Sequence, residues 1–177
     1  MIRIFLVGYM GVGKSTLGKA LAERMKLSLI DTDIFIENRY HRRISDIFAA
    51  HGEERFRDIE HRAICEVSQC EDVVVSTGGG LPCFNNNMDV MNDAGITVYL
   101  KTSVTQLAAR LQASKTVRPV LKNRTGSELE AFIADSLAKR KQFYEQARII
   151  FDAEVMFDDR DVSTMAALLE ELIIKQK

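Results

Sequence analysis

The chain has 177 residues, 46% of them hydrophobic, which is enough for one well-buried core and too little for two ordinary domains. Lys and Arg total 24 against 25 Asp and Glu, and this balance argues against a protein that binds nucleic acid or a membrane surface. We therefore expect a single domain over residues 1–177, a monomer, with a small molecule as its partner.

The N-terminal apolar run, Ile4 to Val7, is too short for a signal peptide or a membrane span, so we interpret it as a buried strand. Cys65, Cys70 and Cys83 form neither an even disulfide framework nor a C-x-x-C metal motif. Such cysteines are typical of a reducing compartment, and we expect a cytoplasmic protein.

Short apolar runs alternate with longer segments of helical period along the chain. This βαβ pattern predicts an α/β fold, in which helices cover both faces of a mostly parallel sheet. The expected strands are 2–7, 28–31, 73–75, 96–100 and 148–151, and the expected helices are 14–26, 34–40, 53–70, one from 103, one from 127, and 162–175.

The starts of two helices match capping boxes, Ser103 with Gln106 and Ser127 with Glu130. Between these two helices, residues 113–126 are polar and basic and have no apolar period. A loop of that length in a compact domain is often functional, so we expect residues 113–126 to form a mobile lid.

The segment from Gly8 to Ser15 matches G-x-x-x-x-G-K-[ST], and it lies between the first strand and the first helix, as the motif requires. Glycine lets the backbone wrap closely around phosphates, and the following helix N-terminus attracts anions. We expect Lys14 to reach the β- and γ-phosphates of ATP and Ser15 to ligate Mg²⁺. The expected ATP-binding residues of this loop are Gly11, Val12, Gly13, Lys14, Ser15 and Thr16.

Two carboxylates, Asp31 and Asp33, follow the second expected strand. Side chains alternate in an extended segment, so both should point toward ligands at the carboxyl end of the sheet. One can support the hydrated metal while the other accepts a hydrogen bond from the attacking hydroxyl. A structural alternative is that Asp33 caps the helix expected from Ile34.

Two arginines are candidates for binding an anionic acceptor. Arg57 lies three residues before Glu60 on a helix, so the carboxylate could hold its guanidinium for a bidentate clamp, although such pairs are also common on solvated faces. Arg140 occupies a position of the next helix where an apolar residue is due. An unpaired buried charge is expensive, so Arg140 should face a ligand or an internal carboxylate.

The fourth candidate feature is the run Gly78-Gly79-Gly80, which follows a buried strand and lets backbone N–H groups approach a ligand closely. This position is where a Walker B aspartate would be expected, and none is present. In the expected lid, Arg118 precedes Pro119, an arrangement suited to delivering a guanidinium onto a transferring phosphoryl group.

In order along most of the chain, these motifs resemble the shikimate kinase family: the phosphate loop, Asp31-Thr32-Asp33, Phe56-Arg57 with Glu60, the three glycines, Arg118-Pro119, and Arg140 with Tyr144. The resemblance implies a three-layer α/β/α P-loop fold with a five-stranded parallel sheet of order 2-3-1-4-5. It also implies a substrate-binding segment around residues 33–60.

The same resemblance implies ATP-dependent phosphorylation of the 3-hydroxyl of shikimate, in the biosynthesis of chorismate and the aromatic amino acids. Asp33 would hold the acceptor hydroxyl, and Asp31 would support Mg²⁺ through water. The acceptor would be bound by Arg57, Arg140 and the backbone of Gly79 and Gly80, and Arg118 would touch the ATP phosphates.

The chain departs from the family pattern at Leu111, where an adenine-packing Arg is often found. Arg110 lies next to it, and we expect Arg110 to contact ATP. Two alternatives stay open, another small-metabolite kinase such as a gluconate kinase, and a nucleotide-binding switch that transfers nothing.

Overall fold

In the computed structural model, residues 1–114, 124–156 and 158–176 are described. Within them, five strands form one parallel sheet in the order β2-β3-β1-β4-β5. This order confirms the topology implied by the family resemblance. The strands are β1 (Arg3–Val7), β2 (Ser28–Asp31), β3 (Val73–Ser76), β4 (Ile96–Lys101) and β5 (Ile149–Asp152).

Alternation along the strands divides the core between the two faces of the sheet. In β1, Ile4 and Leu6 pack into one cluster, whereas Phe5 and Val7 pack into another. All four side chains are fully buried. A central parallel strand is covered on both faces, and this explains why β1 is a continuous apolar run without polar alternation.

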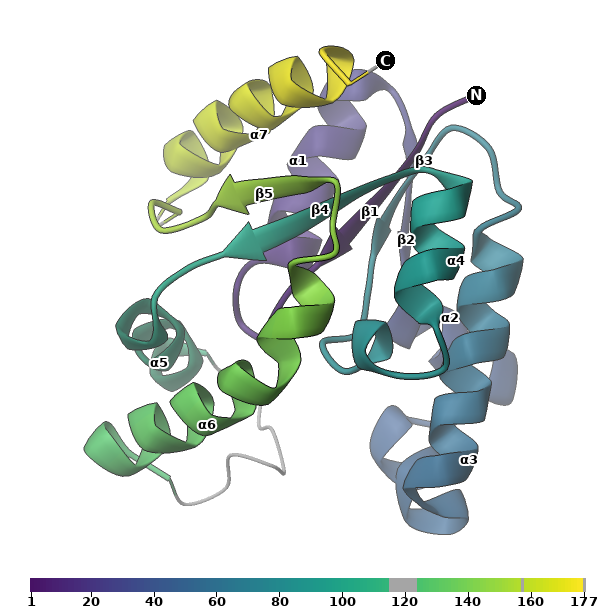
Figure 1. Cartoon of the computed structure of the whole chain (residues 1–177), viewed down its shortest axis with the longest axis vertical. Coiled ribbons are helices and arrows are strands. Elements are labelled where there is room, and N and C mark those ends of the chain that lie inside the picture. Colours follow the sequence, from purple (N-terminus) through teal and green to yellow (C-terminus); the bar gives the residue numbers. More distant parts are fainter. Residues whose placement is uncertain (115–123, 157, 177) are drawn as a thin grey trace.

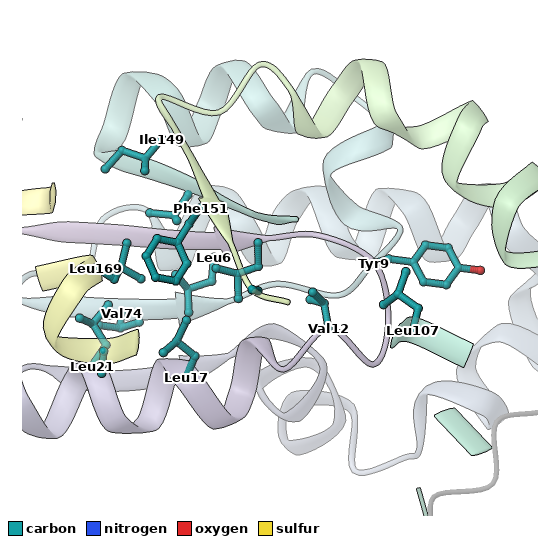
Figure 2. Close-up of a cluster of buried hydrophobic side chains, with 14 of the residues drawn as sticks. Leu6, Tyr9, Val12, Leu17, Leu21, Val74, Leu107, Ile149, Phe151 and Leu169 are labelled. Carbon is teal, nitrogen blue, oxygen red and sulfur yellow. The ribbon is translucent and has the colours of Figure 1, made fainter. Parts of the chain in front are cut away.

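Helices cover each face of the sheet, as the βαβ pattern predicts (Figure 1). On one face, α1 (Lys14–Met25) and α7 (Asp159–Ile174) lie side by side, and Leu17, Leu21 and Leu169 fill the space between them and the strands (Figure 2). On the other face lie α3 (Ile44–Val67) and α4 (Asn87–Ala94). Among the described residues, none of the helices is long and apolar enough to span a bilayer.

The segment after β2 has a small core of its own. The helix α2 (Thr32–Tyr40) packs against α3, and both contribute to a cluster around Ile36, Ile47 and Phe56. Within α3, Gly52 has φ 74° and ψ 176°, so the helix is kinked there. The part after the kink presents Ile64 and Val67 to the sheet, and it is therefore anchored to the main core.

The remaining helices extend from the carboxyl side of β4. After this strand, α5 (Val104–Ala113) packs against α6 (Gly126–Tyr144). The last residue of α6, Tyr144, is buried in the core on the face of the sheet that α3 and α4 cover. A short 3₁₀ turn, η1 (Leu81–Cys83), follows the three glycines. The expected lid lies largely in residues 115–123, outside the described residues.

The two predicted capping boxes had different outcomes. Ser103 does cap α5, because its Oγ accepts a hydrogen bond from the Gln106 N–H at 3.2 Å. The reciprocal bond is made by another residue, since the Ser103 N–H donates to Glu154 Oε2 at 2.7 Å. The box at Ser127 is wrong, because α6 begins at Gly126 with Thr125 at its N-cap.

Most element boundaries were predicted within a few residues. The largest shift that matters for function is in α2, which begins at Thr32 where Ile34 was expected. The final helix begins at Asp159 rather than Val162, and β5 is shifted by one residue. The eight-residue helix α4 was missed, because Asn86, Asn87 and Asn92 gave its segment a turn-like composition.

Gly95 is predicted to be intolerant of any side chain. A Cβ there would lie 2.4 Å from the Arg3 carbonyl oxygen and 2.8 Å from the Arg3 Cβ, so β4 would have to move away from β1. We expect Gly95→Ala to lower the free energy of unfolding by about 1–3 kcal/mol. Thermal unfolding should show a melting temperature lower by several degrees, and an unchanged value would contradict the tight contact.

Candidate active site

The phosphate loop joins β1 to α1 with three glycines of positive φ. Gly11 has φ 81° and Gly13 has φ 104°, conformations that residues with a side chain rarely adopt. A Cβ at Gly13 would also meet the Met156 Cε at 2.7 Å. Among the described residues, no side chain caps the N-terminus of α1, so its first N–H groups are available to a phosphate.

Lys14 is folded back over this loop. Its Nζ donates to the carbonyl oxygens of Gly8 at 2.7 Å and Tyr9 at 3.0 Å, and the residue is buried. Its ammonium group therefore lies on the inner side of the loop. A positive charge held there is suited to bind the phosphates that the loop would enclose.

Ser15, Asp31 and Ser76 bring hydroxyl and carboxylate oxygens together. Ser15 Oγ donates to Asp31 Oδ2 at 2.8 Å and lies 3.1 Å from Ser76 Oγ. The other carboxylate oxygen, Asp31 Oδ1, accepts the Asp33 N–H and so caps α2. A hard cation such as Mg²⁺ prefers oxygen ligands, and this set fits it, with Ser15 and Asp31 as the residues that would hold it directly or through water.

Asp33 lies in the first turn of α2, and the strand-parity argument for its direction was wrong. The capping role considered for Asp33 belongs to Asp31. Asp33 nevertheless reaches the place that was expected, because it lines the same cavity as Asp31. The first turn of the helix turns the Asp33 carboxylate toward the glycines after β3, where a Cβ at Gly78 would lie 2.7 Å from Asp33 Oδ1.

The three glycines after β3 contact three different elements. A Cβ at Gly79 would lie 3.2 Å from the Met10 nitrogen of the phosphate loop, and one at Gly80 would lie 2.8 Å from the Arg57 NH1. The Gly78 N–H donates to Thr32 Oγ1 at 2.8 Å. The backbone of this run therefore lies close to other protein groups, and its approach to a ligand stays a prediction.

A cavity of about 280 Å³ unites the nucleotide-side residues. The predicted site residues that line it are Gly11, Gly13, Lys14, Ser15, Thr16, Asp31, Asp33, Gly79 and Arg110. Val12, Arg57, Gly80 and Arg140 are absent from its lining. Val12 is buried in the main core, Gly80 lies against Arg57, and Arg57 and Arg140 both act on the charge of Glu60. Arg118 lies outside the described residues.

Arg57 is held by two carboxylates, as its spacing from Glu60 suggested. Its NH1 donates to Glu60 Oε2 at 2.5 Å and its NH2 donates to Glu53 Oε1 at 3.0 Å. The guanidinium also stacks 4.1 Å from the centroid of the Phe84 ring. Burial lowers the pKa of Arg57, but the charges of Glu60 and Glu53 outweigh this and raise it. The positive charge of Arg57 is therefore compensated within the protein.

Arg140 differs from Arg57 in this respect. The described residues place no carboxylate within ion-pair distance of Arg140, and its buried NH1 has no hydrogen-bond acceptor among them. Nearby, the Tyr144 hydroxyl donates to the Gly79 carbonyl oxygen at 2.6 Å. The expectation that an internal salt bridge could neutralise Arg140 is thus not met in the described part of the chain, whereas Arg57 is neutralised.

Glu60 connects these charges. The carboxyl is nearly inaccessible, at 3% side-chain exposure, and burial raises its pKa to about 7 even though Arg57 opposes the shift. The negative charge of Asp33 raises the pKa further, whereas the charge of Arg140 lowers it. Because all three charges act on one carboxyl, Asp33, Arg57 and Arg140 belong to a single electrostatic cluster beside the cavity.

The side chain of Arg110 binds backbone carbonyl groups of the phosphate loop and of the segment after β5. Its NH1 donates to the Val12 carbonyl oxygen at 3.0 Å, and its NH2 donates to those of Ala153 at 2.8 Å and Glu154 at 2.9 Å. The guanidinium thus fastens the phosphate loop to the segment after β5. Leu111, where the family often has an Arg, packs its side chain against Gly11.

Several lining residues were not singled out from the sequence. Thr77 donates from its Oγ1 to the Leu6 carbonyl at 3.0 Å, and Ser76 contacts Ser15. Ser76 ends the buried strand β3 and Thr77 follows it, and a position at the carboxyl end of a strand could have identified both. Met10 and Ser114 also line the cavity, and no sequence signal distinguishes them.

A parallel sheet of this order, with a phosphate loop after β1 and a carboxylate pair after β2, defines a P-loop phosphotransferase. Residues 10–172 match the model of the family described as shikimate kinase. The chain is 56% identical over 173 residues to a shikimate kinase of Parabacteroides distasonis, covering 98% of this chain and all of that protein. This chain belongs to the shikimate kinase family, which confirms the resemblance.

Solved structures support the same assignment. A shikimate kinase from Bacteroides thetaiotaomicron superposes with a TM-score of 0.95 at 43% identity, covering 98% of each chain. One from Acinetobacter baumannii, in complex with shikimate, has a TM-score of 0.85 at 31% identity, covering 100% of this chain and 95% of that one. A gluconokinase from Sinorhizobium meliloti, at 15% identity and a TM-score of 0.53, shares the fold.

Glu60 should make stability depend on pH in the opposite direction to an ordinary surface carboxylate. Its pKa is raised from 4.5 to about 7 by burial, so the folded protein retains a proton that the unfolded chain has lost. The stabilisation is full below about pH 4.5 and disappears as pH rises through about 7, a change on the order of 3 kcal/mol.

The test compares the wild type with Glu60→Gln, which mimics the protonated form. The melting temperature of the wild type relative to the variant should be highest near pH 4.5 and lower at pH 8. A difference that is constant over this range would show that folding does not raise the pKa of Glu60.

Proposed function

We propose that this chain transfers the γ-phosphoryl group of ATP to the 3-hydroxyl of shikimate, giving shikimate 3-phosphate and ADP. Family membership and the 56% identical relative named as a shikimate kinase support this activity. The observation that carries the mechanism is the place of Asp33, which lines the cavity formed by the phosphate loop and also acts on the charge cluster at Glu60. A carboxylate there can serve both substrates.

On the nucleotide side, the loop around Gly11 and Gly13 would bind the phosphates through its N–H groups and the N-terminus of α1. Lys14 would exchange its two carbonyl partners for phosphate oxygens, because a phosphate is the stronger acceptor for an ammonium group. Mg²⁺, held by Ser15 and supported by Asp31, would neutralise charge that develops on the phosphates. Arg110 would contribute by fastening the loop at Val12.

On the acceptor side, Arg140 is the residue we propose to bind the carboxylate of shikimate. It combines a partly buried guanidinium with the absence of an ion-pair partner among the described residues, and an organic anion would supply one. Arg57, already paired with Glu60, would shape the same pocket together with the backbone of Gly79 and Gly80. We further propose that Arg118 contacts the ATP phosphates.

The bond changes follow from these positions. The acceptor hydroxyl oxygen attacks the γ-phosphorus in line with the departing ADP oxygen, so one P–O bond forms as the other breaks. The hydroxyl proton passes to the Asp33 carboxylate, which makes Asp33 the base of the reaction. Lys14 stabilises charge on the transferred group, a role that needs it to stay protonated.

A panel of acceptors tests the proposed substrate. ADP release from ATP in the presence of Mg²⁺ should be rapid with shikimate and at background with gluconate and other sugar acids. The result should be confirmed by detecting the phosphorylated product by mass spectrometry. Turnover with a sugar acid and none with shikimate would assign another substrate, and nucleotide binding without transfer to any acceptor would favour a switch.

Substitutions of Asp33 and Asp31 should have different effects on the kinetic constants. Asp33→Asn removes the base and should lower kcat by about 10²–10⁴-fold with little change in the KM for ATP. Asp31→Asn keeps an amide oxygen to cap α2 but removes the charge near Ser15, so it should raise the Mg²⁺ concentration needed for half-maximal rate. An unchanged kcat in Asp33→Asn would remove Asp33 from the chemical step.

A further inference from the structure

The side chain of Tyr9 is unusual for a residue of a phosphate loop. It is 2% exposed, and it packs into the main core with Val12 and Leu107. In Figure 2 it lies at the far end of that cluster from Leu21, with its hydroxyl directed away from the other labelled side chains. The hydroxyl is buried, and the described residues offer it no hydrogen-bond partner. The phosphate motif itself requires no aromatic residue at this position.

The guanidinium of Arg140 lies over this ring. The Arg140 Cζ is 5.4 Å from the Tyr9 ring centroid, within the range of a cation–π interaction. The two residues come from different parts of the fold, since Tyr9 follows β1 and Arg140 belongs to α6. Their contact therefore joins the phosphate loop to the helix that carries the proposed carboxylate-binding arginine.

Within the described residues, the unpaired donor of Arg140 gives the contact with this ring a stabilising role. Its NH1 is buried without an acceptor among the described residues, and such a donor is costly unless another favourable contact compensates for it. The electron-rich face of an aromatic ring provides such a contact, and it is stronger where water is excluded. Tyr9 is itself packed in the core around Val12, so the ring beside the guanidinium has a fixed place.

We propose that Tyr9 is a positioning residue for the acceptor site: its ring holds the Arg140 guanidinium in the orientation that binds the acceptor carboxylate. This inference rests on the proposed function, because it assumes that Arg140 binds the acceptor. The backbone carbonyl of the same residue accepts from Lys14 at 3.0 Å. A single residue of the phosphate loop thus contacts the nucleotide lysine through its backbone and the acceptor arginine through its ring.

The test replaces the ring and then restores it. Tyr9→Leu should raise the KM for shikimate by about 3- to 30-fold, the range that a partly buried cation–π contact allows, and should leave the KM for ATP within about twofold. Tyr9→Phe keeps the ring and should retain a KM for shikimate near that of the wild type. Tyr9→Met serves as a second non-aromatic variant if Tyr9→Leu fails to fold.

A matched control removes an aromatic ring from the same core cluster at a distance from Arg140. Phe151→Leu should lower the melting temperature to a similar extent as Tyr9→Leu, because both rings are buried in that cluster, and should leave the KM for shikimate unchanged. Calorimetric titration of shikimate into each variant should repeat the same order of affinities.

The possible outcomes separate the proposed function from the positioning role of Tyr9. If the wild type does not phosphorylate shikimate, the proposed function fails and the role of Tyr9 fails with it. If the wild type is active but Tyr9→Leu and Tyr9→Met keep its KM for shikimate, or Tyr9→Phe is as impaired as they are, the positioning role of the ring is wrong. An equal rise in both KM values would assign Tyr9 to the integrity of the phosphate loop alone.

Discussion

The site depends on the absence of side chains at three consecutive positions after β3. A Cβ at Gly78, Gly79 or Gly80 would lie within about 3 Å of Asp33, the phosphate loop and Arg57 respectively. Glycine therefore allows the end of one central strand to touch three segments that are far apart in sequence. The phosphate loop, Asp33 and Arg57 can approach the end of β3 this closely only because this backbone takes so little room.

Charge in the acceptor region is distributed unevenly between two arginines. Arg57 has Glu60 and Glu53 as partners, so its charge is compensated without a ligand. Arg140 lies over the Tyr9 ring in the described structure, and in the proposed function its anionic partner is the acceptor carboxylate. Such an arrangement avoids the cost of two uncompensated charges, because only one of the two arginines lacks a carboxylate among the described residues.

The strength of the local signal decides how much of this arrangement follows from the sequence. The phosphate loop and the elements beside it were predictable, since the apolar period and the motif context are unambiguous for β1 and α1, whereas the sheet order came from the family resemblance. The direction of Asp33 was predicted from strand alternation, which does not apply, because Asp33 is already helical. The sequence does not show that α2 begins at Thr32, immediately after the strand. The family resemblance, rather than strand parity, supplied the correct place for this carboxylate.

Other features depend on tertiary contacts that a single sequence does not reveal. The Glu154 bonds to Ser103 join residues 51 positions apart, and Glu154 took the place expected for Gln106 in the cap. Likewise, Arg140 was recognised as a buried cation from its position in an apolar stripe, but its aromatic neighbour Tyr9 could not be inferred, since nothing local links the two residues. Long-range partners of this kind require the fold.

The kink at Gly52 has a consequence for how such an enzyme can diverge. It separates the outer part of α3, which packs with α2 around Ile36 and Ile47, from the inner part that is fixed to the sheet through Ile64 and Val67. Substitutions among residues 44–51 can therefore accumulate with little effect on the strands, because this part of α3 is separated from the sheet by the kink. The first turns of α3 can thus vary between related chains, while Arg57 and the inner part of the helix keep their places against the sheet.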